Sequence, residues 1–169
     1  EIGVRLVGSE MCIRDRGAET LRWLTEECMP YIDQTFDTER RERWLMGYSL
    51  AGLFALWAAY ELDCFSGIIC CSGSLWFQDW DIYVKEHTLH SKCKIYLSLG
   101  GREEKTKNKV MARVGDRTRE QKKKLEKDPM AEQVFLEWNA GGHFADEGKR
   151  LAKGIRYLFH ISQSGGNIK

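Results

Sequence analysis

Short apolar segments alternate along this chain with segments of helical periodicity, and this alternation restricts its fold more than any other feature. We expect apolar strands at 43–47, 67–71 (GIICC), 95–99 (IYLSL) and 134–138 (VFLEW). We expect helices between and after them at 50–60, 79–86, 107–127 (where Gly115 is expected as an interruption) and 145–161. A short run without polar positions suits a strand buried on both faces, which is typical of parallel sheets. The sequence therefore predicts an α/β fold, with a mostly parallel sheet covered by helices on both faces.

The two ends of the chain are expected to differ from this central part. Residues 7–16 (VGSEMCIRDR) fit no such periodicity and match the translation of a transposon-end sequencing adapter. We therefore expect 1–16 to be a non-native segment, with a genuine amphipathic start as the alternative, and the natural protein to begin upstream. A helix over 18–36, kinked at Pro30, then opens a single partial domain, 17–161. The tail, 162–169, is expected to be disordered.

Composition limits the classes of function. The net charge is +1, with 43% hydrophobic and 30% charged residues, which gives no general reason to expect nucleic acid or an anionic membrane as partner. The lysines at 122–124 are interleaved with acidic residues, as on a solvated helix face. No apolar run reaches the length of a membrane span. The six cysteines form no Cys-x-x-Cys pair, so we expect free thiols, a cytoplasmic location and no metal site or cofactor.

The stretch GYSLAGLFALW (47–57) places Ser49 between an expected strand and an expected helix. A strand that turns directly into a helix around a strained nucleophile leaves no room for large side chains, and Gly47, Ala51 and Gly52 meet that requirement. The usual pattern is Gly-x-Ser-x-Gly, whereas here Ala51 takes the last small position. Serine is also a favoured helix N-cap, so this stretch alone leaves both readings of Ser49 open.

Partners for a nucleophilic serine follow two later strands. A hydroxyl needs a base, and the base needs an acid that fixes its tautomer. In α/β-hydrolases the three occur in the chain order serine, acid, histidine, and here Ser49, Glu103 and His143 follow successive expected strands in that order. Glycines before His143 allow the loop to bend. Glu103 and Glu104 are adjacent, so only one is expected to reach the histidine; we favour Glu103 and expect Glu104 to be solvated. The remaining histidines lie in less suitable places: His87, His90 and His160.

These residues give the chain a resemblance to a known family. It resembles the putative esterases of the α/β-hydrolase superfamily, the group with esterase D-like enzymes and trilactone siderophore esterases. The resemblance runs from about Gly17 to Phe159 and is carried by GYSLAGLFALW, CSGSLW (71–76), YLSLGGREEKTKN (96–108) and GGHF (141–144). It implies the C-terminal part of an α/β-hydrolase fold whose N-terminal strands are absent from this sequence.

The resemblance also implies a reaction. Ser49 would attack an ester carbonyl and His143 would act as base, with Glu103 as acid, although some siderophore esterases resemble a Ser–His dyad. The N–H of Leu50, which follows the nucleophile, should donate to the oxyanion; a second donor normally comes from an earlier loop. Tyr48 and Trp76 are candidate walls of the substrate pocket, and Trp76 is equally a candidate core residue.

The expected partner is a small-molecule ester, either a siderophore lactone or another acylated compound, and the residues leave the oligomeric state open. The alternatives are an acyltransferase with the same residues and a catalytically silent binding module. We expect the chain by itself to be nearly inactive.

Overall fold

The computed structural model describes residues 9–38 and 41–165, which fall into two compact units, Glu1–Arg41 and Glu42–Lys169. The first unit is helical, with α1 Ser9–Trp23, a π-helical turn η2 Leu24–Cys28 and α2 Met29–Phe36. The first helix thus begins at Ser9 instead of at Ala18, so it includes part of the segment 1–16 that was expected to be non-native. Residues 1–8 of that segment lie outside the described part. The helical segment continues through Pro30, which lies in the first turn of α2 and directly follows the π-helical turn and Met29. The kink expected at Pro30 stays a prediction.

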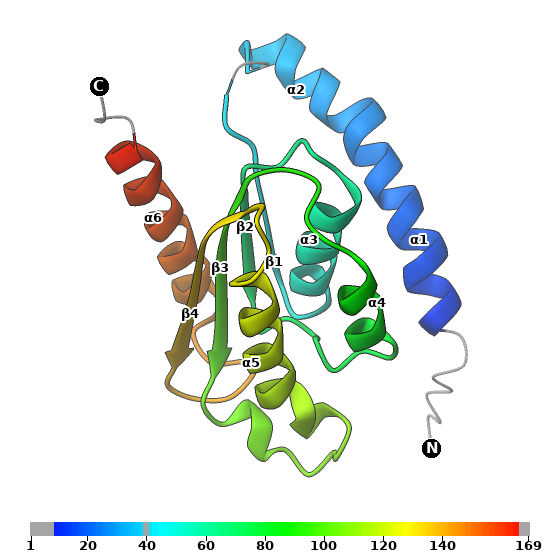
Figure 1. The fold of residues 1–169 in the computed structure, drawn as a ribbon, viewed down its shortest axis with the longest axis vertical. Helices are drawn as coiled ribbons and strands as arrows, with labels where there is room; N and C mark the ends of the chain where they lie inside the picture. The colour runs from blue at the N-terminus through cyan, green and yellow to red at the C-terminus, as the bar shows by residue number, and fades with distance from the viewer. Residues whose placement is uncertain (1–8, 39–40, 166–169) are drawn as a thin grey trace. The chain divides into compact units, whose positions relative to one another are not determined.

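The second unit contains one four-stranded sheet in which every neighbouring pair is parallel (Figure 1). The strand order follows the chain order. The register aligns Trp44 with Gly67, Ile68 with Ile95, and Leu97 with Leu136. The strands are β1 Trp44–Tyr48, β2 Gly67–Cys71, β3 Cys93–Gly100 and β4 Ala131–Asn139. The helices of this unit are α3 Leu50–Glu61, α4 Trp80–Glu86, α5 Val114–Leu125 and α6 Glu147–Gly165.

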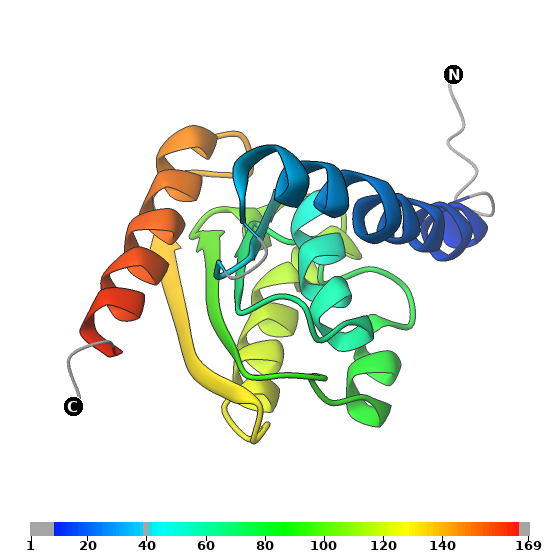
Figure 2. The same ribbon diagram turned by 90° about the horizontal axis from the view of Figure 1, so that it is seen from above.

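Helices cover both faces of this sheet, as the alternation predicts (Figure 2). On one face α3 packs against β1 and β2, and α5 packs against β3 and β4; on the other face α6 packs against β1, β2 and β3. All five residues of β2 are buried. A core cluster between α6 and the sheet consists of Ile69, Cys71, Tyr96 and Leu158. The approach of α6 is close, because a Cβ on Gly154 would lie 2.5 Å from the Ile69 Cγ2.

Several boundaries differ from those expected, most of all that of α5. α5 begins at Val114 instead of at Lys107, after a 3₁₀ turn, η4 Met111–Arg113, and Gly115 lies in its first turn without interrupting it. A second 3₁₀ turn, η3 Glu103–Lys105, follows β3. α6 extends to Gly165, beyond the expected end at Ile161, and residues 166–169 lie outside the described part.

Two further observations on the described residues concern the apolar content of their helices and the state of their cysteines. None of their helices combines the length and the apolar content needed to cross a bilayer. Five cysteines carry free thiols, namely Cys28, Cys64, Cys70, Cys71 and Cys93, and burial raises the pKa of Cys93 to about 12. Buried thiols of this kind are packing residues with little thiolate at neutral pH.

Candidate active site

Ser49 occupies a strained turn between β1 and α3. Its backbone has φ 57° and ψ −120°, a conformation that costs a residue with a side chain on the order of 1–3 kcal/mol. Neighbouring backbone holds it there: the Ser49 N–H donates to the Cys71 carbonyl (2.9 Å), and the Ser49 carbonyl accepts from the N–H groups of Leu53 and Ser74 (3.1 Å each). The turn is therefore fixed to the end of β2 as well as to its own helix.

The small residues beside Ser49 have the steric role that the sequence predicts. A Cβ on Gly47 would lie 2.1 Å from the Ala51 carbonyl oxygen. A Cβ on Gly52 would lie 3.1 Å from the Gly47 carbonyl oxygen and 3.2 Å from that of Cys71. Strand, turn and helix thus touch through their backbones.

The Ser49 hydroxyl does not cap the helix that follows it. Although Ser49 stands at the N-cap position of α3, its hydroxyl makes no capping hydrogen bond. Its Oγ lies 3.0 Å from the Nε2 of His143 and 3.5 Å from the Oγ of Ser74. The hydroxyl faces an imidazole instead of the helix.

The structure brings Ser49, His143 and Glu103 into one line of hydrogen bonds. The Nδ1 of His143 lies 2.7 Å from the Oε2 of Glu103, on the side of the ring opposite Ser49. Each residue follows the carboxyl end of a different strand, β1, β3 or β4, and these ends meet at one edge of the parallel sheet. With the Nδ1 proton donated to Glu103, the Nε2 is left to accept the Ser49 proton, which is the tautomer that a base requires.

The Glu103 carboxylate is buried and fully hydrogen-bonded. Its Oε1 accepts from the Ser72 hydroxyl (2.7 Å), the Gly100 N–H (2.7 Å) and the Arg150 guanidinium (2.9 Å). Burial by itself raises the pKa of this carboxyl, but the hydrogen bonds from Ser72, His143 and Gly100 together lower the pKa below its ordinary value. Glu103 is therefore ionised at neutral pH.

The neighbouring glutamate has a different environment. Glu104 is 30% exposed, pairs with Arg119 at 2.9 Å and lies against Gly115. The same Arg119 guanidinium stands 4.7 Å above the ring of Trp138. Of the two adjacent glutamates, only Glu103 contacts His143.

The other residues proposed from the sequence lie around this line in different ways. As the first residue of α3, Leu50 has an N–H that no carbonyl within the helix can accept. The Tyr48 hydroxyl donates to the His143 carbonyl (2.5 Å), and the two rings are 5.5 Å apart. Trp76 is half-buried beside Phe77 and, within the described residues, makes no hydrogen bond to this line.

Sequence reasoning missed two polar residues of the site, Ser72 and Arg150, which are both buried. Ser72 belongs to the CSGSLW stretch, at a left-handed φ of 47°, so a short serine-rich turn after β2 was its only signal. Arg150 lies in an amphipathic helix rich in charge, where a guanidinium normally faces water. Only the packing of α6 on the sheet shows that it does not.

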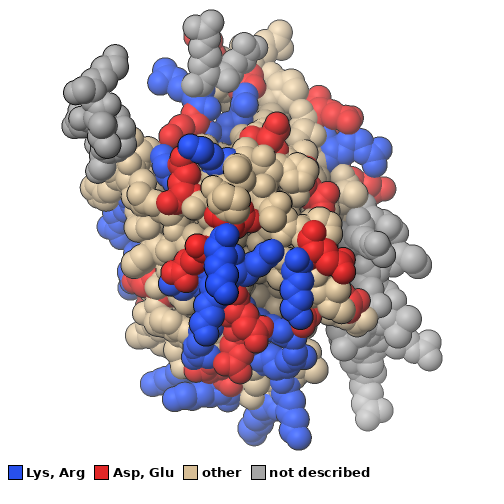
Figure 3. All heavy atoms as spheres, viewed as in Figure 1, with Lys and Arg blue, Asp and Glu red and all other residues tan. Residues whose placement is uncertain are grey.

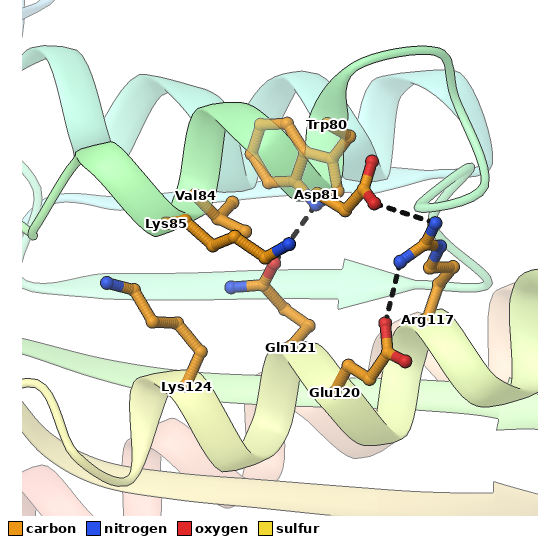
Figure 4. A pocket seen from close by; sticks show the side chains of 8 residues that line it. All are labelled: Trp80, Asp81, Val84, Lys85, Arg117, Glu120, Gln121 and Lys124. Carbon is orange, nitrogen blue, oxygen red and sulfur yellow. Dashed lines mark hydrogen bonds and ion pairs between the residues drawn. The ribbon is translucent and has the colours of Figure 1, made fainter.

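A separate hollow of about 150 Å³ lies between α4 and α5 (Figure 4). Arg117 crosses it and pairs with Asp81 and Glu120, both at 2.8 Å, while the Trp80 indole donates to Gln121 at 3.0 Å. The residues that line it are Trp80, Asp81, Val84, Lys85, Arg117, Glu120, Gln121 and Lys124. None of them belongs to the Ser49 site, so the hollow is not part of that site.

Charges of both signs mingle on the face shown in Figure 3. On α5, ion pairs join Arg119 to Asp116 and Lys122 to Glu126. Within residues 9–38 and 41–165, no group of three or more His, Cys, Asp or Glu side chains is placed to hold a metal ion.

Comparison with known proteins places this geometry in a family. The family described as "Putative esterase" matches residues 14–147. Siderophore hydrolase EstA from Aspergillus nidulans is similar in structure, with a TM-score of 0.71 at 20% identity over 86% of this chain and 57% of its own. EstB from the same organism gives 0.67 at 19% identity over 80% and 56%. An IroE-like serine hydrolase from Shewanella oneidensis gives 0.69 at 20% identity over 83% and 46%.

The chain thus spans about half the length of these three structures, which at such identities establish the fold alone. No curated protein matches it. The family match covers most of the chain, including the elbow, the Glu103 turn and the His143 loop. The chain therefore belongs to the Putative esterase family and has the α/β-hydrolase fold.

Proposed function

We propose that this chain carries the reacting groups of a serine esterase that cleaves carboxylic esters through an acyl-enzyme on Ser49. One observation carries the proposal: on a strained turn, the Ser49 Oγ lies 3.0 Å from the Nε2 of His143, whose Nδ1 lies 2.7 Å from the buried Glu103 carboxylate. These distances suit proton transfer from a hydroxyl to a base oriented by an acid.

The reaction follows from these positions. His143 removes the Ser49 proton as the oxygen attacks the ester carbonyl, and the Glu103 carboxylate stabilises the imidazolium that forms. The Leu50 N–H, at the start of α3, donates to the developing oxyanion. His143 then protonates the departing alcohol. In the second half, His143 takes a proton from water as the water oxygen attacks the acyl carbon. His143 then gives this proton to the Ser49 oxygen as the bond to the acyl group breaks and the carboxylic acid leaves.

The proposed substrate is a small-molecule ester, such as a siderophore lactone or another acylated compound. Two observations support this choice: the family is one of esterases, and two of the structural neighbours are siderophore hydrolases. Tyr48 and Trp76 are proposed as walls of the pocket because both belong to the segments that carry Ser49 and Ser72.

A fluorophosphonate probe tests the nucleophile directly. We expect mass spectrometry to find the phosphonyl group on Ser49, with no label in Ser49→Ala and slower labelling in His143→Gln. Ser91→Ala, in the loop before β3, is the matched control and should label like the unaltered chain. A covalent label accumulates over hours, so it detects the site even if a missing oxyanion donor lowers the rate by about 10²- to 10³-fold.

Each other outcome rejects part of the proposal. Equal labelling of Ser49→Ala would place the reactive group elsewhere. No labelling of Ser49 would favour the binding module. If the chain turns over esters only when a second alcohol is present, and product analysis finds the acyl group on that alcohol, the protein is an acyltransferase.

A further inference from the structure

Arg150 contacts both the proposed acid and the loop of the proposed base, yet it belongs to none of the segments that carry the family resemblance. We propose that Arg150, on α6, is a positioning residue: its guanidinium fixes the Glu103 carboxylate and the His143 loop together, and its charge compensates that of Glu103. This inference rests on the proposed function, because it assigns a role within the same site.

The guanidinium is enclosed and its two terminal nitrogens have separate tasks. Arg150 is 1% exposed. Its Nη1 donates to the Glu103 Oε1 (2.9 Å) and to the Ser72 Oγ (2.8 Å), and the Tyr48 hydroxyl lies 3.0 Å away. Its Nη2 donates to the carbonyls of Gly142 (2.9 Å) and Ala140 (3.2 Å).

The first task is to orient the acid. Arg150, Ser72 and Gly100 all contact the same carboxylate oxygen, Oε1, so the other oxygen is left to face His143. There is no spare room around this contact, because a Cβ on Gly100 would lie 2.8 Å from the Arg150 Nη2 and 2.9 Å from the Glu103 Oε1. The carboxylate is therefore held in a single orientation.

The second task is to hold the loop that carries the base. The Gly142 carbonyl directly precedes His143 and accepts from Nη2. The His143 carbonyl accepts from the Tyr48 hydroxyl, which itself lies beside Nη1. One planar cation thus fixes the backbone before and after the imidazole, which a lysine with a single ammonium group could not do.

The third contribution is electrostatic. Arg150 and Glu103 form a buried ion pair, with exposed fractions of 1% and 4% for their side chains. Other titratable groups that interact with the guanidinium are Tyr48 on β1, Cys71 on β2 and Asp146, directly before α6; Glu147, in the first turn of α6, acts on Tyr48. Tyr48 and Cys71 are neutral at pH 7, because burial raises both pKa values, and Asp146 pairs with Lys149. Arg150 is thus the cation in contact with Glu103 within the described residues.

If Arg150 only supported the fold, replacing it would leave the pH dependence of Ser49 labelling unchanged. In the proposed role, replacing it changes that pH dependence. Removing the cation leaves the Glu103 charge uncompensated beside the ring, which favours the imidazolium. In Arg150→Met we therefore expect the pH at which labelling of Ser49 reaches half its maximum to rise. Arg150→Lys keeps the positive charge but loses the two separate terminal nitrogens of the guanidinium. The pH midpoint of Ser49 labelling should therefore stay unchanged, while the maximal labelling rate falls by about 10- to 100-fold.

The experiment measures both properties on the full chain. Fluorophosphonate labelling rates are recorded from pH 5 to 9, and the His143 ring is titrated by NMR. Arg156→Met and Arg156→Lys, at an exposed position of the same helix, are the matched controls and should change neither quantity. An unchanged midpoint in Arg150→Met would overturn the electrostatic role, and an unchanged maximal rate in Arg150→Lys would overturn the geometric role.

Two safeguards keep the outcomes distinct. If Arg150→Met does not fold, Arg150→Lys still tests both roles: its maximal labelling rate tests the geometry, and its pH midpoint, which must match that of the unaltered chain, tests the charge. If the unaltered chain does not label at all, the proposed function fails, while the NMR titration still decides whether Arg150 controls the protonation of His143.

Discussion

Two adjacent glutamates in one backbone turn, Glu103 and Glu104, have different partners. In η3, Glu103 points into the protein and contacts His143, while Glu104 pairs with Arg119. A 3₁₀ turn separates successive side chains by about 120° around its axis, so the two neighbours cannot share a target. The two residues therefore form a natural pair of test and control.

We expect Glu103→Gln to slow the labelling of Ser49 by about 10³- to 10⁴-fold and Glu104→Gln to leave it within about 3-fold. The glutamine oxygen can still accept from Arg150, but its NH₂ group would face the His143 Nδ1 and favour the tautomer that carries the proton on Nε2. That nitrogen could then no longer accept the Ser49 proton. Comparable rates in the two variants would show that His143 acts without Glu103, as in a Ser–His dyad.

Glu103 also links stability to pH. Its pKa in the folded chain lies below the ordinary value of 4.5, so the unfolded chain binds more protons as the pH falls. The stabilisation is complete above about pH 4.5 and is lost as the pH falls through the folded-state pKa. In urea unfolding measured at several pH values, the free energy of unfolding should decrease with falling pH, with a slope of at most about 1.4 kcal/mol per pH unit. Ser72→Ala should reduce the slope, since it removes a hydrogen bond to the charged form; an unchanged slope would exclude that hydrogen bond as a cause.

At the scale of elements, the site depends on how closely strand, turn and helix approach at the elbow. Gly47 on β1 touches the backbone of α3, and Gly52 on α3 touches the ends of β1 and β2. These contacts involve rigid backbone atoms that cannot move aside as a flexible side chain could. The glycines are therefore part of the geometry that holds Ser49 in its strained conformation.

We expect Gly47→Ala to lower the free energy of unfolding by about 3 kcal/mol or more, because its methyl group would overlap the Ala51 carbonyl. Gly148→Ala is the matched control: no atom lies within 4 Å of its Cβ position on α6, so better helix propensity should stabilise the chain by up to about 1 kcal/mol. Thermal unfolding followed by circular dichroism measures both. Equal melting temperatures for the two variants would contradict the close packing described at the elbow.

At the scale of the whole molecule, β1 lies at one edge of the sheet and leads into the Ser49 turn. Within the described residues no strand pairs with its outer side, and Met46 at its centre is 49% exposed. An apolar strand with free N–H and carbonyl groups on its edge is a template for pairing with another chain.

We therefore expect the chain to self-associate at concentrations on the order of 10 μM, and Met46→Lys to reduce this association, because a charge on an edge strand opposes strand pairing. Ile155→Lys, which places the same charge at an exposed apolar position of α6, should have little effect. Light scattering with size-exclusion chromatography measures the outcome. A monomeric unaltered chain at that concentration would contradict the prediction.

The order and character of the elements could be read from the sequence because they depend on local patterns. GIICC predicted a strand buried on both faces, and β2 is that strand. The order of Ser49, Glu103 and His143 along the chain predicted their meeting, because parallel strands deliver their carboxyl ends to one edge. The predicted boundaries of α5 were wrong, and the ion pair between Glu104 and Arg119 was not predicted, because no local pattern records the contacts among Glu104, Gly115 and Arg119.

What the amino-acid sequence determined by itself was thus the alternation of strands and helices, the small residues of the elbow, and the chain order of hydroxyl, carboxylate and imidazole. Only the tertiary structure decided which glutamate contacts His143. It also decided that Arg150 is buried against Glu103, from which it is separated by 47 positions in the sequence. The physical reason is that periodicity reports which face of a segment avoids water. It does not report which charged groups two packed segments will enclose between them.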